Sequence, residues 1–394
     1  MKIFFAITRY LLFAGVFATA VISCSKSTKT SEKDPAAGQE EQELQLENYN
    51  HLAWSANDVI YELNTRQFTQ KGTFNAALKH LDRLHMIGVD IIWFMPIHPI
   101  SEKNRKGELG SPYAVSDYTK VNPNYGTLED FRSFVDQAHV LGMHVLIDWV
   151  PNHTGWDNEW IEQHPEWYTQ DEDGNVIHPE GTDWTDVADL NYDNQEMRNQ
   201  MTEEMKFWLK NADIDGFRCD VAHSVPVDFW DSTITELRKV KPVFMLAEAE
   251  KPELNEVGFD MSYGWSFHHL TNQIAAGEKP ASAIDEYFNN KYQEFRRQDI
   301  LMNFTSNHDE NSWNGHVFER YGEGAKTFAV LVSTMPGMPL LYNGQEAALE
   351  KRLEFFKHDP IPWGNYRYEY FYKQLFTLKE NNKALWNGRA GGEI

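Results

Sequence analysis

The chain has 394 residues and a formal net charge of −23, from 36 basic and 59 acidic side chains. Its length allows two or three domains of about 150 residues, or one large α/β barrel of about 200 to 400 residues. A hydrophobic content of 41% with 14% aromatic residues excludes a mostly disordered or collagen-like chain. The acidic charge, without a local basic patch, argues against nucleic acid as a partner and favours a neutral or cationic ligand.

Residues 1–23 have the features of a signal peptide. Lys2 and Arg9 precede an uncharged run over 10–22, which is shorter than the ~20 residues needed to span a bilayer. The small and aliphatic residues before Cys24 resemble a bacterial lipoprotein signal, in which cleavage leaves a lipidated N-terminal cysteine. This interpretation predicts a membrane anchor at Cys24 and a location in the cell envelope, facing the periplasm or the exterior. An ordinary secretory leader and an N-terminal membrane helix are the alternatives.

Residues 24–50 are expected to form a solvated tether ahead of one folded domain over residues 51–390. The stretch 25–48 contains two leucines, no aromatic residue and many polar side chains, so it cannot bury enough apolar surface to fold. The chain has two cysteines, and lipidation of Cys24 would leave Cys219 without a disulfide partner.

Eight short apolar runs predict eight β-strands separated by helices. Several runs are apolar almost throughout, as expected for parallel strands covered on both faces. Phe131, Phe134 and Ala138 lie on one face of a predicted helix that begins with the capping box Thr127-x-x-Asp130. No GxGxxG fingerprint follows the first strand, so a closed (β/α)8 TIM barrel is favoured over an open doubly wound sheet. The strands are expected at residues 59–63, 89–95, 145–150, 214–219, 243–247, 259–263, 301–305 and 339–342.

The interval between the third and fourth strands is too long for an ordinary loop. After a helix near 194–211 is subtracted, about 40 residues rich in Trp, Asp, Gly and Pro remain. We therefore expect a small inserted subdomain over 153–193. Because catalysis in such barrels takes place at the C-terminal ends of the strands, this insert should wall the active site.

Acidic residues follow the fourth, fifth and seventh predicted strands. Asp220 comes two residues after Arg218, so both face the same side, and the guanidinium is expected to lower the pKa of Asp220 and keep it ionised. The apolar residues before Glu248 could raise its pKa and keep it protonated as a general acid. Asp309, directly after His308, is the acid that follows the seventh predicted strand. Two carboxyls flanking a glycosidic bond are typical of glycoside hydrolysis, whereas a structural ion pair that closes the barrel is the alternative for Arg218 and Asp220.

On these residues the chain resembles the α-amylase family of glycoside hydrolases, family 13, over roughly residues 55–385. No single motif would be specific, but their order and number together are. Four ordered motifs carry the resemblance, at residues 148–153, 216–220, 247–248 and 306–309, with supporting stretches at 116–126, 188–191 and 337–346.

The resemblance implies Asp220 as nucleophile, Glu248 as general acid/base and Asp309 as transition-state stabiliser. The implied enzyme is an endo-acting, retaining hydrolase of α-1,4 bonds in starch, maltodextrins or maltooligosaccharides, working through a covalent glycosyl-enzyme without a redox or nucleotide cofactor. The subsite of the attacked sugar would be lined by Tyr113, Asp148, His153, Arg218 and His308.

Three further expectations concern the surroundings of this site. By resemblance, calcium would bind near the insert through Asn152 and Asp189, although a metal-independent polar cluster is nearly as well supported. Relatives usually continue into a C-terminal β-sandwich, which we expect to be absent or truncated because the sequence stops at Ile394. Trp313 is better placed to stack on a sugar than the tryptophans of the insert, which are more often the core of a small subdomain.

Other functions remain open on the sequence alone. The same catalytic residues serve α-glucan transglycosylases and cyclomaltodextrinase- or neopullulanase-type enzymes, although the N-terminal β-domain typical of the latter is missing. A lipid-anchored glycan-binding protein without activity is a further alternative, against which the three intact carboxylates argue. The sequence does not predict the oligomeric state.

Overall fold

The computed structural model describes residues 49–392. The predicted signal peptide, Cys24 and nearly all of the predicted tether therefore lie outside the described residues. Tyr49 is buried, and its hydroxyl lies 2.9 Å from Ser55 Oγ. Tyr49, which the sequence places in the predicted tether, therefore packs against the folded domain.

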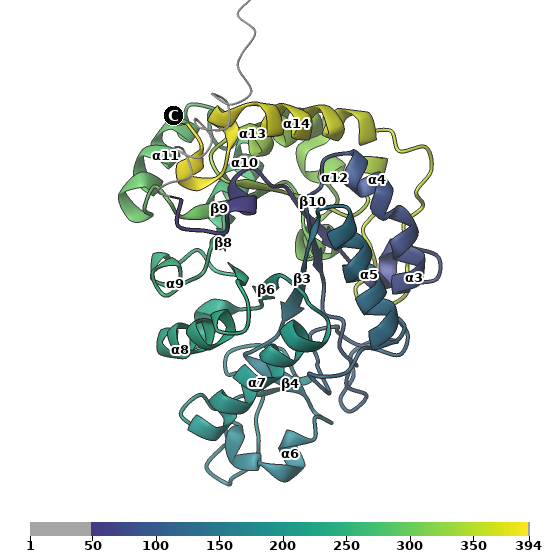
Figure 1. Cartoon of the computed structure of the whole chain (residues 1–394), viewed down its shortest axis with the longest axis vertical. Coiled ribbons are helices and arrows are strands. Elements are labelled where there is room, and N and C mark those ends of the chain that lie inside the picture. The colour runs from purple at the N-terminus through teal and green to yellow at the C-terminus, as the bar shows by residue number, and fades with distance from the viewer. Residues whose placement is uncertain (1–48, 393–394) are drawn as a thin grey trace, which may run out of the picture. The chain divides into compact units, whose positions relative to one another are not determined.

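Eight parallel strands close into a barrel, in the spatial order β1-β10-β9-β8-β7-β6-β3-β2 (Figure 1). Each of the eight predicted runs overlaps one of these strands, and the (β/α)8 barrel predicted from the sequence is confirmed. The strands are β1 Ile60–Leu63, β2 Ile91–Phe94, β3 His144–Trp149, β6 Gly216–Cys219, β7 Phe244–Ala247, β8 Met261–Tyr263, β9 Ile300–Phe304 and β10 Met338–Tyr342.

Side chains on each strand alternate between the barrel interior and the layer under the helices. On β2, Ile91 and Trp93 belong to the apolar cluster inside the barrel, whereas Ile92 and Phe94 belong to the outer cluster. The Phe94 ring lies 4.8 Å from that of Phe134 on a covering helix. Both faces of the strand are buried, which explains why the runs are apolar throughout.

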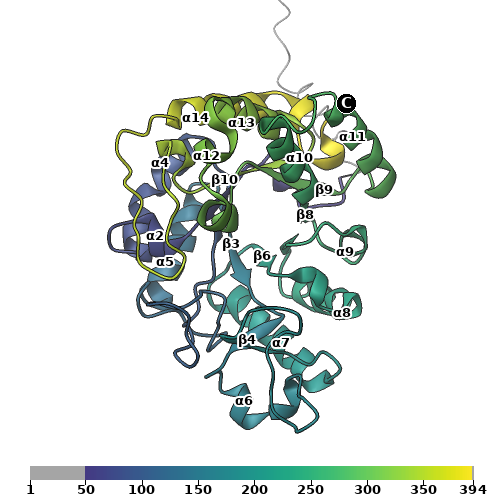
Figure 2. The ribbon, with the colours of Figure 1, turned by 180° about the vertical axis from the view of Figure 1, so that it is seen from behind.

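Helices cover the outside of the barrel. The capping box predicted at Thr127 is present, since its side chain accepts from the Asp130 amide and its own amide donates to the Asp130 carboxylate. Helices α13 and α14 lie side by side in both Figure 1 and Figure 2. The covering helices are α2 Thr65–Phe68, α3 Phe74–Ala77, α4 Leu81–Met86, α5 Leu128–Val140, α7 Gln195–Asn211, α8 Val227–Arg238, α9 Pro252–Glu256, α10 Trp265–Ala275, α11 Ala283–Glu294, α12 Val317–Tyr321, α13 Ala325–Thr334 and α14 Glu369–Asn381.

The residues between β3 and α7 form a small subdomain of their own. Strand β4 (His153–Gly155) pairs antiparallel with β5 (Val187–Asp189), and the short helix α6 (Trp160–Gln163) lies beside them (Figure 1). Trp160 and Trp167 are each 6% exposed, and their rings meet edge to face with centroids 5.2 Å apart. These two tryptophans pack inside the insert and belong to the same buried cluster as the layer between the barrel strands and the helices.

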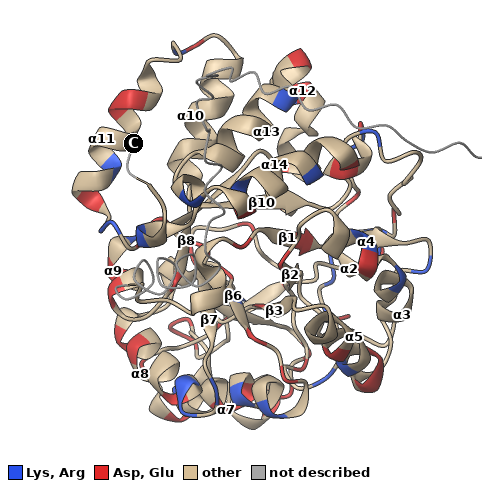
Figure 3. Ribbon diagram, turned by 45° about the horizontal axis from the view of Figure 1, so that its top comes forward, with Lys and Arg blue, Asp and Glu red and all other residues tan. Residues whose placement is uncertain are grey.

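Charged residues of both signs are interspersed on the outer helices, as on α7 and α11 in Figure 3.

Within residues 49–392, no helix is both long and apolar enough to cross a bilayer. Cys219 is buried and has a free thiol.

Gly216 opens β6 at a point where two strands approach closely. A Cβ atom there would lie 1.9 Å from the Phe244 carbonyl oxygen, and the pairing of β6 with β7 prevents the backbone from moving away. We expect Gly216→Ala to lower the free energy of unfolding by about 2 kcal/mol or more, measured by thermal or urea unfolding. The control is Gly324→Ala, where the nearest atom is a Phe328 ring carbon at 3.3 Å. Unchanged stability of Gly216→Ala would contradict the close approach.

Candidate active site

A cavity of about 1010 Å³ lies at the C-terminal ends of the barrel strands. Asp220 follows β6, Glu248 follows β7 and Asp309 follows β9, and all three line this cavity. The insert contributes Trp184 and Asp186 to the lining, so it walls the site as expected from its position after the third strand. The volume is at the upper end of the range of small-molecule pockets.

Arg218 holds the carboxylates of the site together. Its Nη1 donates to Asp148 Oδ1 at 2.8 Å and to Asp220 Oδ1 at 2.7 Å. Its Nη2 lies 2.9 Å from Glu248 Oε2, as an ion pair without hydrogen-bond geometry. The parallel register of β3 and β6 places Asp148 directly beside Arg218. One fully buried cation therefore contacts three acidic side chains.

Aromatic rings surround the guanidinium of Arg218. Its central carbon lies 5.2 Å from the ring centroid of Trp93, 5.6 Å from Tyr263 and 5.7 Å from Tyr113. Such contacts favour a cation that has been withdrawn from water. The sequence analysis did not predict Trp93 or Tyr263. Both could have been identified in the sequence as large aromatic side chains at inward-facing positions near the C-terminal end of a strand.

Burial sets the pKa values of the two candidate catalytic carboxyls. It raises the pKa of Glu248 to about 7, against the opposing charge of Arg218, in the direction predicted from the sequence. For Asp220 the prediction was wrong, because burial raises its pKa above the ordinary value even though Arg218 lowers it. The sequence revealed the adjacent cation but not the loss of water around the carboxyl, which has the larger effect.

Glu248 is also fixed by the backbone. The Val221 amide donates to Glu248 Oε2 at 2.9 Å. The neighbouring acid of the same motif, Glu250, is engaged elsewhere, since it accepts from the Ser266 amide at 2.7 Å and pairs with Lys291 at 2.8 Å. The two acids of this motif thus have different surroundings, and only Glu248 contacts Arg218.

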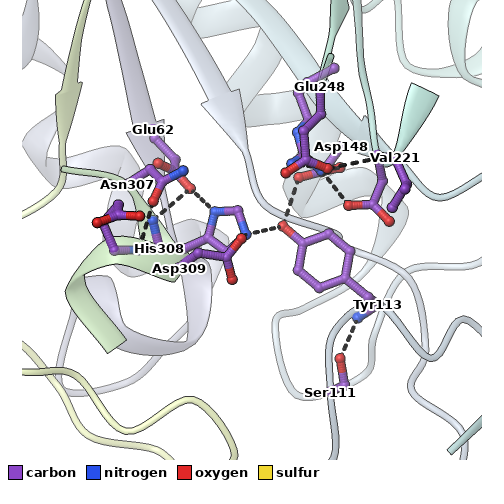
Figure 4. Close-up of polar contacts among 12 residues, drawn as sticks. Glu62, Ser111, Tyr113, Asp148, Val221, Glu248, Asn307, His308 and Asp309 are labelled. Atoms are coloured by element: carbon purple, nitrogen blue, oxygen red, sulfur yellow. Dashed lines mark hydrogen bonds and ion pairs between the residues drawn. The ribbon is translucent and has the colours of Figure 1, made fainter. Parts of the chain in front are cut away.

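His308 and Tyr113 connect the two sides of the site (Figure 4). The Tyr113 hydroxyl lies 2.8 Å from His308 Nε2 and donates to Asp148 Oδ2 at 3.1 Å. His308 Nδ1 lies 2.5 Å from Glu62 Oε1 on β1. Glu62 was not predicted as a site residue, although a lone acid within the apolar first strand was a visible signal.

The remaining predicted sugar-binding residues differ in exposure. His153 lines the cavity, and burial lowers its pKa to about 4, so its imidazole is neutral near pH 7. Asp148 and Arg218 have no exposed surface and do not line the cavity. Arg218 donates to Asp220, and Asp148 accepts from Tyr113. Both Asp220 and Tyr113 line the cavity.

Asp309 begins a turn that is tied to the loop after β10. It precedes the π-helix Glu310–Asn314, and its carboxyl is 39% exposed. In that π-helix, Asn311 accepts from the Leu353 amide at 2.8 Å and donates to the Lys351 carbonyl at 3.1 Å. The position of the third acid therefore depends on two loops.

Aromatic residues also line the cavity away from the carboxylates. Trp313 is 52% exposed and its ring lies 5.2 Å from that of Phe355, which is parallel to Tyr113 within 9°. From the insert, Trp184 reaches the cavity, with its ring 5.5 Å from His153. Flat, partly exposed rings of this kind suit the apolar faces of sugars.

The predicted calcium ligands Asn152 and Asp189 both have protein partners in the structure. Asp189 accepts from Thr169 at 2.7 Å, and the Asn152 amide contacts His153 at 3.2 Å. Within the part of the chain that the structure describes, no three His, Cys, Asp or Glu side chains gather closely enough to hold a metal ion. Calcium also binds through Asn and backbone carbonyl oxygens, so the calcium site stays a prediction, and no step of the mechanism below is assigned to a metal.

A family model described as "Alpha amylase, catalytic domain" matches residues 50–373. The chain belongs to the α-amylase family, glycoside hydrolase family 13. The match covers the whole barrel up to α14 and includes the insert and all three candidate carboxylates.

Solved structures of this family resemble the chain closely. A noncanonic maltogenic alpha-amylase from Thermotoga neapolitana is 33% identical with a TM-score of 0.78, over 84% of this chain and 78% of that one. An alpha-amylase from Lactobacillus plantarum is 31% identical with a TM-score of 0.78, over 86% of this chain and 82% of that one.

Curated relatives in this family include hydrolases and transferases. An alpha-amylase from Haloarcula japonica is 27% identical over 86% of this chain and 50% of its own length. An alpha-1,4-glucan:maltose-1-phosphate maltosyltransferase from Mycobacterium tuberculosis is 31% identical over 81% of this chain and 46% of its own length. The chain thus spans about half the length of these curated relatives.

Proposed function

We propose that the protein is an endo-acting, retaining α-glucan hydrolase that cleaves α-1,4-glucosidic bonds in starch, maltodextrins or maltooligosaccharides. The observation that carries the proposal is the cluster of Asp220, Glu248 and Asp309 on one large cavity, with Arg218 bonded to the first and paired with the second. Partly exposed aromatic rings beside these acids suit a neutral sugar polymer.

In this proposal the reaction has two steps. Asp220 attacks the anomeric carbon while Glu248 protonates the leaving oxygen, which gives a covalent glycosyl-enzyme. Glu248 then removes a proton from water, which attacks the same carbon and releases the sugar in its α configuration. A pKa of about 7 suits both roles, because Glu248 must give up and regain a proton near neutral pH. Asp309 would stabilise the positive charge that develops on the sugar ring.

Transfer to a sugar acceptor is the alternative within this chemistry. Hydrolysis and transglycosylation share the glycosyl-enzyme and differ in whether water or a sugar hydroxyl attacks it. Assays on starch, pullulan, cyclodextrin and maltotriose distinguish an α-amylase from cyclodextrin- or pullulan-cleaving enzymes. Maltose 1-phosphate with a maltooligosaccharide acceptor tests the maltosyltransferase activity named for one relative. Binding of maltooligosaccharides without any release of sugar would favour a glycan-binding protein.

Removing the general acid tests the mechanism. We expect Glu248→Gln to lower kcat on maltooligosaccharides about 10²- to 10⁴-fold with the thermal unfolding midpoint preserved, because the amide cannot donate a proton to the leaving oxygen. Glu250→Gln is the matched control and should lose less than about tenfold, since Glu250 bonds to Ser266 and Lys291 instead. Proton NMR of the first product should show the α anomer. A wild-type rate in Glu248→Gln, or an initial β product, would overturn the assignment.

The pH dependence of kcat/KM should follow the same two carboxyls. Glu248 acts in its protonated form, so activity is lost as the pH rises through about 7. Asp220 acts as a carboxylate, so activity is lost as the pH falls through its pKa, which burial raises above the ordinary value of 3.8. A bell-shaped profile measured on a soluble maltooligosaccharide is the expected result. A profile that stays flat from about pH 6 to 9 would contradict the role of Glu248.

We also propose that the mature protein is anchored in the cell envelope through lipid on Cys24, facing the periplasm or the exterior. The proposal rests on the sequence before Cys24, which resembles a lipoprotein signal. In a bacterial host fed labelled palmitate, Cys24→Ala should lose the label and leave the membrane fraction. Cys219→Ala is the control, since it changes the only other cysteine. Unchanged labelling of Cys24→Ala would contradict the anchor.

A further inference from the structure

A chain of hydrogen bonds crosses the candidate site from β1 to β3. Glu62 Oε1 lies 2.5 Å from His308 Nδ1, His308 Nε2 lies 2.8 Å from the Tyr113 hydroxyl, and that hydroxyl lies 3.1 Å from Asp148 Oδ2 (Figure 4). Only His308 and Tyr113 of these four line the cavity. The mechanism above gives no role to Glu62.

The direction of these hydrogen bonds is set at the Asp148 end. Asp148 also receives Arg218 Nη1 at 2.8 Å and Trp93 Nε1 at 3.2 Å, so three donors converge on it. Burial raises the pKa of Asp148 to about 8 against the charge of Arg218, but with three donors directed at it we take Asp148 as the acceptor. The single proton of the Tyr113 hydroxyl points to Asp148, so its oxygen accepts from His308. Nε2 of His308 therefore carries a proton.

The other ring nitrogen of His308 faces an acid. Nδ1 lies against Glu62, which is fully buried, and the His308 amide also approaches the same oxygen at 3.4 Å. The other oxygen, Oε2, is buried without a hydrogen-bond partner, so His308 is the group that offsets the charge of Glu62. A buried carboxylate requires such a paired cation, and a ring protonated on both nitrogens supplies it.

Several charged groups face this imidazole from different elements. Burial alone would lower the pKa of His308, but Asp309, whose Oδ2 lies 3.4 Å from Nε2, and Glu62 together raise it to about 9 against the opposing charge of Arg218. Burial raises the pKa of Glu62, and His308 is the main group that lowers it. Asp148 and Asp220 complete the charged groups on this side of the site.

We propose that Glu62 is a positioning residue that keeps His308 doubly protonated, so that the imidazolium holds the Tyr113 hydroxyl by a charge-assisted N–H and pairs with Asp309 at the cavity wall. This inference rests on the proposed function, in which Tyr113 and Asp309 contact the attacked sugar. Hydrogen bonds from a charged donor are about twice as strong as those from a neutral one. Glu62 acts through His308 and does not touch the cavity.

The test combines the variant Glu62→Gln with the protonation state of His308. Glutamine has nearly the same shape and can still accept from Nδ1, but it lacks the charge. Nitrogen NMR of histidine-labelled protein distinguishes an imidazolium from a neutral ring, and the variant His308→Asn identifies the signals. We expect His308 to carry both protons at pH 8 in the wild type and only one in Glu62→Gln.

Activity should follow the same pattern. Relative to the wild type, Glu62→Gln should lose roughly 10- to 100-fold in kcat/KM at pH 8, the range found when the outer hydrogen-bond partner of a metal-bound histidine is removed, and much less at pH 5, where the ring regains its proton. Glu62→Asp, which keeps the charge, should restore part of the loss. The matched control is Glu346→Gln, another fully buried glutamate, paired with Arg83 at 3.1 Å, whose variant should leave the pH profile unchanged.

Two results would overturn the inference. One is a neutral His308 in the wild type at pH 8, which requires no variant to fold. The other is an equal loss of activity in Glu62→Gln at pH 5 and pH 8 with the His308 signals unchanged, as expected of a purely structural residue. A wild-type protein without activity on any α-glucan would instead contradict the proposed function, and the NMR result would still decide the protonation of His308.

Discussion

The site depends on one positive charge that has no exposed surface. Arg218 is fully buried, so the acids and aromatic rings around it must compensate its guanidinium. This constraint explains why residues from β2, β3, β6, β7 and β8 converge at one end of the barrel.

A second buried pair, Glu62 with His308, lies on the other side of Tyr113. The two pairs are joined through the Tyr113 hydroxyl and Asp148, so the charges of the site form one network and not two. In such a network the protonation of each group depends on the others. The half of the site that carries Glu248 and the half that carries His308 are therefore electrostatically linked.

Much of this arrangement could be predicted from the sequence. Apolar runs located all eight barrel strands, and the two-residue period placed Arg218 and Asp220 on the same side. Trp93, Tyr263 and Glu62 were missed because they lie far from Arg218 and His308 in the chain and become neighbours only when the barrel closes. The direction of the pKa shift of Asp220 was missed for a related reason, since burial is a property of the folded barrel and not of neighbouring residues.

The π-helix after Asp309 has a consequence for engineering this family. Because Asn311 bonds to the backbone at Lys351 and Leu353, the segment that carries the third acid and the loop after β10 form one structural unit. The same loop carries Phe355, whose ring lies against that of Trp313 at a tilt of 41° beside the cavity. A chimera that takes only one of these two loops from a relative would lose these hydrogen bonds. A chimera designed to change sugar preference therefore has to exchange both loops together.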